Sequence, residues 1–344
     1  MQAAQVVSHG SPLVIQEVPI PSPSIGEVLV RLEVSGVCHT DVHVQMGDWK
    51  VKCPLPMTPG HEGVGTVVKL GESVNNVNST LQIGDRVTVP WLHSSCGQCE
   101  HCWSGWETVC SQQKRTGFTS HGTFSQYCIV DAAFAVPVPE ALSSEQAAVI
   151  SCAGVTVYKG LKVSEVHPGQ WVVIVGGSGN LGHAAIQYAL AMGMRVIGVD
   201  TSQSKCDFMT SLGAHATVNV STQDIVSTIK SLTGGAGAHG ALIIAPVASA
   251  ISIAVKYLRP RGTVVVIGLP PGKFEVDVFD MVLNAITIRG SIVGTRLDLQ
   301  EALNLATDGK IQCKIRKRNF TEIQDVLDDL KDGKIEGCVA IDIP

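Results

Sequence analysis

The sequence predicts an α/β protein in which a doubly wound parallel sheet follows a β-rich N-terminal domain. Between residues 171 and 267, predicted strands and helices alternate five times, which is typical of a parallel sheet covered by helices. Before about residue 150, short β-type runs are instead separated by many Gly and Pro residues, which indicates a folded β-domain. We therefore expect two domains of different construction.

The individual elements follow from apolar runs and turn residues. The β-rich part has strand-like runs at 27–32, 65–69 and 85–89. The predicted later strands are 171–175, 195–199, 216–220, 241–244 and 263–267, and the predicted helices are 181–192, 204–212, 222–232 and 248–258. The tail has predicted helices near 298–307 and 321–331 and a strand near 338–343, and we expect it to pack on the first domain. We expect one domain at 1–152, completed by 290–344, and a second at 153–289.

Composition narrows the class of protein. Only 16% of the 344 residues are charged and the mean hydropathy is positive, which favours an oligomer. The net charge of −5 argues against nucleic acid or an anionic membrane as a partner. No apolar run approaches the roughly 20 residues of a membrane span. The start shows no secretory signal, so the eleven cysteines favour thiolate ligands in a reducing compartment, and we expect a cytoplasmic protein.

Seven residues fall into two patterns of zinc ligands. The first is a compact cluster of four cysteines, Cys96, Cys99, Cys102 and Cys110, in the spacing C-x2-C-x2-C-x7-C. Four thiolates close a tetrahedron, which makes a structural site. The second pattern is dispersed over Cys38, His61 and Cys152, and two thiolates with one imidazole leave a fourth position open for chemistry.

A nucleotide-binding fingerprint lies between the first strand and first helix of the second domain. Its G-x-G-x-x-G pattern consists of Gly177, Ser178, Gly179, Asn180, Leu181 and Gly182. We expect the first glycine to allow a tight turn and the second to let the backbone approach a pyrophosphate. Asp200 ends the next strand, where a carboxylate would bind a ribose hydroxyl and repel a 2′-phosphate, which favours NAD over NADP. Lys205 could contact the same ribose, or it could be an ordinary solvated lysine.

The residues around the dispersed ligands suit alcohol oxidation. Zinc with an open position would polarise an alcohol oxygen. Thr40 and His43 could carry the released proton to solvent, and Asp41 could orient His61. Glu62 is a candidate transient ligand. Trp49 and Trp91 could narrow a substrate pocket, although core packing is the commoner fate of a tryptophan.

The chain resembles the zinc-dependent medium-chain alcohol dehydrogenases, most of all the yeast, fungal and bacterial tetrameric ethanol-type enzymes. The stretches that carry the resemblance include CHTDVHVQMGDW, PGHEGVGTVV, CGQCEHCWSGWETVC, SCAGVTVYKGLK and GGSGNLGHAAIQYA, and the similarity covers essentially the whole chain. It implies a GroES-like β-domain with a structural zinc lobe at about 93–112, a Rossmann domain and a homotetramer.

The resemblance also implies roles for single residues. Cys38, His61 and Cys152 would hold catalytic zinc, with Glu62 as an alternate ligand, and the four-cysteine cluster would hold a second zinc ion. Thr40 and His43 would carry the proton, and both would lie at the coenzyme. The other implied coenzyme contacts are His39, Gly177, Gly179, Asn180, Leu181, Gly182, Asp200, Lys205, Leu269, Ser291 and Val293.

The leading hypothesis is an NAD-dependent enzyme that interconverts small primary alcohols and aldehydes. A zinc dehydrogenase for secondary, polyol or aromatic alcohols is the second enzymatic reading. A non-catalytic zinc- and nucleotide-binding scaffold or sensor is the alternative of another class, and the open ligand set with its relay residues argues against it.

Two positions depart from the pattern of the family. Leu269 stands where methionine is frequent, with little expected effect, and Cys338 stands where an arginine usually pairs with the coenzyme phosphates. We expect Cys338→Arg to tighten NADH binding roughly ten- to a hundredfold, because a charge-assisted contact contributes about 1.5–3 kcal/mol. A fluorescence titration with NADH measures the change, and an unaltered Kd would contradict it.

Overall fold

The computed structural model describes residues 1–74 and 80–344, which form two compact units. The first unit contains Met1–Cys152, Thr295–Thr307 and Cys313–Pro344, and the second contains Ala153–Gly294 and Asp308–Gln312. None of the helices in the described residues has the length and apolar character needed to cross a bilayer.

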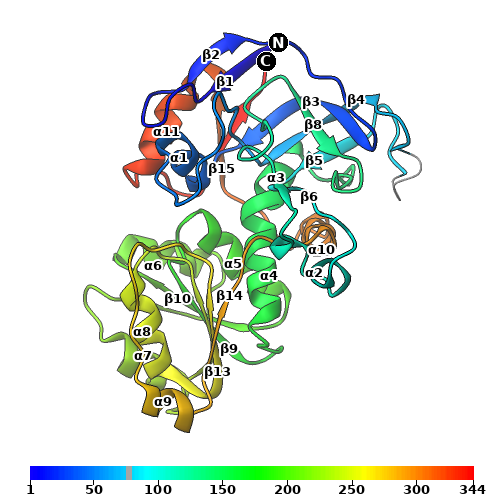
Figure 1. The fold of residues 1–344 in the computed structure, drawn as a ribbon. Helices are drawn as coiled ribbons and strands as arrows, with labels where there is room; N and C mark the ends of the chain where they lie inside the picture. Colours follow the sequence, from blue (N-terminus) through cyan, green and yellow to red (C-terminus); the bar gives the residue numbers. More distant parts are fainter. Residues whose placement is uncertain (75–79) are drawn as a thin grey trace. The chain divides into compact units, whose positions relative to one another are not determined.

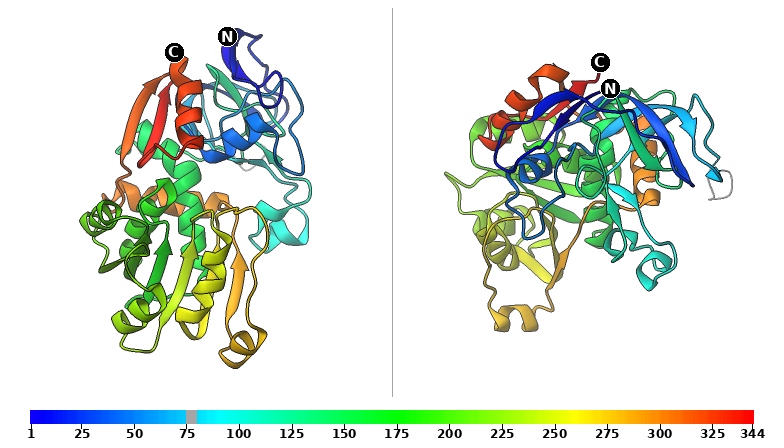
Figure 2. Two further views of the ribbon diagram at one scale, coloured as in Figure 1. Left: turned by 90° about the vertical axis from the view of Figure 1, so that its left-hand side faces the viewer. Right: turned by 45° about the horizontal axis from the view of Figure 1, so that its top comes forward.

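A six-stranded sheet organises the first unit (Figure 1). Its order is β15-β16-β3-β4-β5, and β8 also pairs with β3. The bounds are β3 Glu27–Gly36, β4 Gly63–Leu70, β5 Arg86–Val89, β8 Tyr127–Asp131, β15 Ile315–Asn319 and β16 Cys338–Asp342. β16 pairs antiparallel with β3, so the tail of the chain extends the sheet begun near its start. Figure 2 shows β15 and β16, in orange and red, side by side.

Alternation along β3 explains the core of this unit. Val28, Val30 and Leu32 are buried on one face with side chains of β4, β5 and β8. A second cluster packs α1 against α11 around Val42, Phe124 and Ile323. The other elements of this unit are β1 Gln2–Gln5, β2 Val14–Glu17, α1 His39–Met46, β6 Leu92–Ser94, α2 Glu100–Trp103, β7 Lys114–Arg115, α3 Ser144–Val149, α10 Arg296–Thr307 and α11 Ile323–Lys331.

The second unit is a doubly wound parallel sheet in the order β11-β10-β9-β12-β13-β14. The strands are β9 Trp171–Val175, β10 Arg195–Asp200, β11 Ala216–Asn219, β12 Ala238–Ile243, β13 Leu258–Val266 and β14 Thr287–Gly290. The helices are α4 Val155–Val163, α5 Asn180–Ala191, α6 Gln203–Ser211, α7 Ile225–Leu232, α8 Ala248–Tyr257 and α9 Val278–Leu283. The order reverses between β9 and β12, and ligands of such sheets bind at the carboxyl ends of the strands near this point.

Three elements, β14, β15 and α9, were not predicted, because they lack the apolar runs or helical periodicity on which the sequence predictions rested. β14 is short and its Arg289 bonds the carbonyl of Val163 and the carboxylate of Glu165. β15 is an edge strand with the sequence IRKRN, and charge is usual where a strand has one free edge. α9 has only six residues, too few for a helical period to be read.

Candidate active site and metal centres

Four buried side chains from three segments of the first unit converge on one point. Cys38, His61, Glu62 and Cys152 each offer a ligand atom, and these atoms all lie within 4.8 Å of one another. Cys38 caps the N-terminus of α1, His61 and Glu62 directly precede β4, and Cys152 lies in a π-helical turn after α3. The Sγ atom of Cys152 is 3.3 Å from Nε2 of His61.

The carboxylate of Asp41 holds two of these segments together. Its Oδ2 accepts the backbone N–H of Cys38 at 2.9 Å, and its Oδ1 accepts the N–H of Gly60 at 3.0 Å. Nδ1 of His61 lies 3.1 Å from the same Oδ1, so the imidazole presents Nε2 to the cluster. Asp41 is fully buried. Burial lowers the pKa of His61, but the carboxylate of Asp41 outweighs this effect and raises that pKa well above its usual value. The site therefore favours a cation on Nε2, the position that a metal would take.

Glu62 supplies the sharpest test of whether a metal fits here. Both of its carboxylate oxygens are buried and have no hydrogen-bond partner among the described residues. Burial raises the pKa of Glu62 well above its usual value. A Cβ atom on Gly36 would overlap Oε2 of Glu62, so the glycine leaves space for the carboxylate. A bound cation would supply the missing partner.

The two thiols in this cluster shift the pKa of one another in opposite directions. A hydrogen bond from Cys152 holds the pKa of Cys38 well below its usual value, and the same contact raises the pKa of Cys152. Metals bind the thiolate form of cysteine, so Cys38 is prepared for a ligand role. Two thiols, an imidazole and an unpartnered carboxylate are a donor set that suits zinc.

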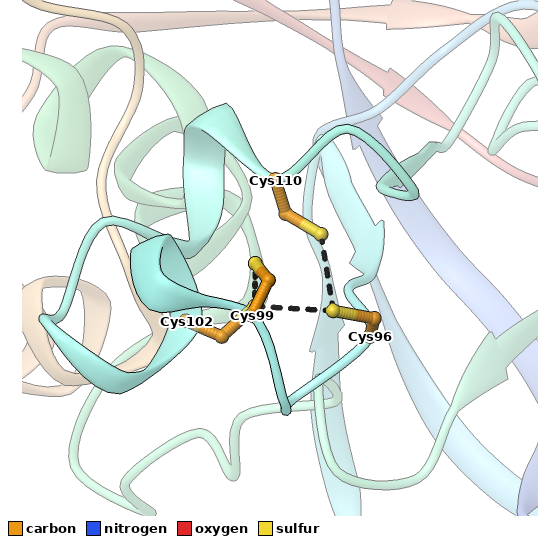
Figure 3. A group of neighbouring side chains, drawn as sticks. All are labelled: Cys96, Cys99, Cys102 and Cys110. Carbon is orange, nitrogen blue, oxygen red and sulfur yellow. Dashed lines mark hydrogen bonds between the residues drawn. The ribbon is translucent and has the colours of Figure 1, made fainter.

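The four-cysteine cluster lies on a separate loop of the same unit (Figure 3). The Sγ–Sγ distances are 3.6 Å for Cys110 and Cys96, 3.6 Å for Cys99 and Cys102, and 3.9 Å for Cys96 and Cys102. Tetrahedral zinc–sulfur bonds of about 2.3 Å imply sulfur–sulfur separations of roughly 3.8 Å. The N–H of Gln98 lowers the pKa of Cys96 to about 6, which favours its thiolate. The cluster therefore fits a four-thiolate zinc site.

The two predicted relay residues lie on α1, three residues apart. No hydrogen bond joins the side chains of Thr40 and His43 within the described part of the chain. Nδ1 of His43 instead bonds Asp48 at 2.9 Å, which directs Nε2 away from that carboxylate. Sequence reasoning missed Asp48. The sequence feature that could have identified Asp48 is an acidic residue just beyond the end of α1. There Gly47, in the left-handed conformation, turns the chain back towards His43.

A cluster of aromatic side chains contacts His61 through Trp91. The rings of Trp91 and His61 are 5.1 Å apart, and Trp49 lies 6.3 Å from Trp91. Phe118, which sequence reasoning missed, is 5.5 Å from Trp49 and 6.0 Å from Trp91. Trp91 is buried in the core, and its ring also lies beside that of His61.

The glycine fingerprint lies in the second unit, between β9 and α5. The tight turn is made by Gly176, whose φ is +87°, one residue before the glycine expected to make it. Gly177 has a different role, because a Cβ there would overlap Sδ of Met209. At Gly179 a Cβ would meet only one atom, at 3.8 Å, so the loop is open where a ligand would approach. Gly182 permits close contact with the carbonyl of Gly176, and Asn180 and Leu181 begin α5.

Asp200 at the end of β10 is held by three neighbours. Ser178 donates to its Oδ2 from Oγ at 2.7 Å, and the N–H of Thr201 donates to Oδ1 at 2.8 Å. Lys205 forms an ion pair with Oδ1 at 3.1 Å. Burial raises the pKa of Asp200, but these donors outweigh it and the pKa lies below the usual value. Asp200 is therefore a fixed carboxylate anion, and sequence reasoning had not assigned Ser178 a part in holding it.

The remaining predicted coenzyme residues follow other strands. Leu269 is exposed after β13, and Ser291 and Val293 follow β14. The Oγ atom of Ser291 is buried without a hydrogen-bond partner among the described residues. His39 is in the first unit, exposed at the start of α1. Within the second unit, the candidates thus gather after the carboxyl ends of β9, β10, β13 and β14, where doubly wound sheets bind ligands.

Comparison with known proteins matches a different family description to each of the two parts of the chain. A family described as "Alcohol dehydrogenase GroES-like domain" matches residues 24–140, and one described as "Zinc-binding dehydrogenase" matches residues 180–308. An alcohol dehydrogenase of Moraxella sp. is 48% identical over 342 residues, which is 99% of each chain.

Two solved structures of the same fold contain different coenzymes. Acetophenone reductase from Geotrichum candidum, in complex with NAD, is 29% identical with a TM-score of 0.86, over 99% of this chain and 97% of that one. A zinc-binding dehydrogenase from Sinorhizobium meliloti, bound to NADP, is 27% identical with a TM-score of 0.88, over 100% and 99%. The matches to both parts of the chain and the full-length relative show that this protein belongs to the zinc-binding alcohol dehydrogenase family of oxidoreductases.

Proposed function

We propose that this enzyme interconverts small primary alcohols and aldehydes with NAD as coenzyme, and that it holds two zinc ions per chain. The observation that carries the proposal is the buried donor set of Cys38, His61 and Cys152, together with the unpartnered carboxylate of Glu62. When bound, zinc supplies a Lewis acid for the alcohol oxygen and NAD supplies the acceptor of the hydride.

The chain's own residues position these groups and move the proton. Asp41 orients His61 so that Nε2 points to the cluster. Thr40 Oγ1 would accept the proton of the alcohol as the hydroxyl releases its own. Because no hydrogen bond in the described part of the chain joins Thr40 to His43, an intervening water or hydroxyl would carry that proton to His43, which is half-buried and held at Nδ1 by Asp48. We assign the first unit to catalysis and the second to NAD binding, and this division is part of the proposal.

The aromatic residues support a small substrate. Trp49, Trp91 and Phe118 are in contact with one another beside His61, which favours a short alkyl chain over a bulky one. Secondary, polyol or aromatic alcohols remain the second candidate class, and the NAD-bound relative named acetophenone reductase gives that class a specific basis.

A homotetramer in the cytoplasm completes the proposal. The exposed apolar side chains of α9 include those of Val278, Phe279, Val282 and Leu283, which support burial against another copy of the chain. Eleven free cysteines support a reducing compartment. We propose no nucleic acid or membrane partner.

Removal of zinc tests the proposal directly. We expect the purified protein to contain about two zinc ions per chain and to reduce NAD with ethanol, followed at the absorbance of NADH. A chelator should abolish this turnover, and added zinc should restore it. Two zinc ions without turnover of ethanol would shift the assignment to a bulkier or secondary alcohol. One zinc ion and no turnover with any alcohol would contradict it.

Replacement of Asp41 tests how the ligands are positioned. We expect Asp41→Asn to weaken the catalytic zinc about 10- to 100-fold, because residues that orient a metal-bound histidine typically contribute that much. Competition with a chromogenic chelator measures the affinity. Asp207→Asn is the matched control, since Asp207 is an exposed acid whose carboxylate accepts a hydrogen bond only from Gln203 within the part of the chain that the structure describes. Equal zinc affinity in the two variants would show that Asp41 does not hold the site.

Replacement of His43 tests the proton path. We expect His43→Gln to slow turnover near neutral pH, because glutamine cannot take up and release a proton as imidazole does. A small titratable base such as imidazole should restore part of the rate. Turnover equal to that of the unmodified enzyme would remove His43 from the path, whereas unaltered zinc content would exclude loss of metal as the cause.

A further inference from the structure

The carboxylate of Asp200 is enclosed by donors of two kinds. Thr201 and Lys205 come from its own segment, one and five residues along the chain. Ser178 comes from the glycine loop after the neighbouring strand, and it donates twice to Oδ2, from the N–H at 3.2 Å and from Oγ at 2.7 Å. Ser178 therefore connects the glycine loop, which is expected to bind the pyrophosphate, with Asp200, which is expected to bind the ribose.

These donors differ in how easily they can move. A carboxylate offers about four acceptor positions, and the five contacts from Ser178, Thr201 and Lys205, the longest of them 3.4 Å from Oγ1 of Thr201, leave none of these positions free. A ribose hydroxyl needs one position, so one donor must leave. The side chain of Lys205 is 44% exposed and free to swing away, whereas Ser178 is 9% exposed. Ser178 and Thr201 therefore remain on Asp200 when a ribose binds.

We propose that Ser178 is a positioning residue for coenzyme selectivity, whose hydroxyl fixes the Asp200 carboxylate where it accepts a ribose 2′-hydroxyl and opposes a 2′-phosphate. The inference rests on the proposed use of NAD. Without the hydroxyl, Oδ2 keeps only the longer bond from the backbone N–H, and the carboxylate can rotate away from a phosphate. Ser178 occupies a variable position of the G-x-G-x-x-G pattern, so the pattern alone carries no such role.

The same hydroxyl has the opposite effect when Asp200 is absent. The donors of Ser178, Thr201 and Lys205 then surround a position that has lost its anion. A 2′-phosphate can take that position and accept the hydroxyl of Ser178. Loss of the hydroxyl should therefore weaken NADH binding in the natural enzyme and NADPH binding in the Asp200→Ala variant. A residue that only stabilised the loop would weaken binding of the same coenzyme in both backgrounds.

The test is a fluorescence titration of the zinc-loaded enzyme with NADH and with NADPH. We expect Ser178→Ala to lower the ratio of the NADPH Kd to the NADH Kd about tenfold, the effect of one hydrogen bond to a charged group. In the Asp200→Ala background, Ser178→Ala should instead raise the Kd of NADPH and leave that of NADH nearly unchanged. Ser178→Thr, which keeps the hydroxyl, should restore selectivity. Ser178→Cys keeps the volume with a weak donor and replaces the alanine variant if that fails to fold.

Ser211→Ala is the matched control, because Ser211 is an exposed serine on α6 whose hydroxyl, among the described residues, bonds only the carbonyl of Phe208. Two results would overturn the inference. In the first, Ser178→Ala shifts the ratio of the NADPH Kd to the NADH Kd in the same direction in the natural enzyme and in Asp200→Ala. In the second, this ratio is as high in Ser178→Ala as in Ser211→Ala. Its failure is separable from failure of the proposed function. If the natural enzyme binds NADPH as tightly as NADH, the NAD assignment is wrong. If Asp200→Ala removes selectivity and Ser178→Ala does not, only the role of Ser178 is wrong.

Discussion

The candidate metal site of Cys38, His61, Glu62 and Cys152 depends on one buried carboxylate, that of Asp41. Cys38 lies just after β3 and His61 just before β4, at the two ends of the segment that connects these strands, and nothing in their own chemistry brings them together. The two oxygens of Asp41 bond the backbone of both segments and the Nδ1 atom of His61. A buried anion is costly unless each oxygen is satisfied, so the same bonds that satisfy Asp41 hold the ligands in place. The sheet brings the segments close, and Asp41 fixes their final positions.

The two clusters of ligands are built in different ways. The four cysteines lie within one short loop, so local turns suffice to bring their sulfur atoms to tetrahedral spacing. The second cluster requires the antiparallel pairing of β3 with β4 and the π-helical turn that carries Cys152. It also requires Gly36, because a side chain there would displace Glu62. A local cluster suits a structural role, whereas ligands from three segments leave room for an open position.

The sequence allowed the main strands and helices to be predicted because their signals are local, and it singled out the cysteine, histidine and glutamate residues that the structure brings together in two clusters. The apolar runs of β9 and β12, the cysteine spacing and the glycine fingerprint each reflect a short-range requirement. The roles of Asp48, Phe118 and Ser178 were not predicted, since each depends on where a loop turns after its strand or helix ends. The first glycine of the fingerprint was assigned the wrong task for the same reason. The positive φ of Gly176 and the close contact of Gly177 with Met209 are both fixed by tertiary packing and not by the spacing of glycines in the sequence.

Anomalous diffraction at the zinc absorption edge tests the central claim most directly, because it locates each metal relative to its ligands. The account predicts two peaks per chain, one bound by the four cysteines and one by Cys38, His61 and Cys152, with Glu62 or a non-protein atom completing the second set. A single peak at the four cysteines, in crystals grown with excess zinc, would contradict the account, because the buried donors around Asp41 would then serve some purpose other than binding metal.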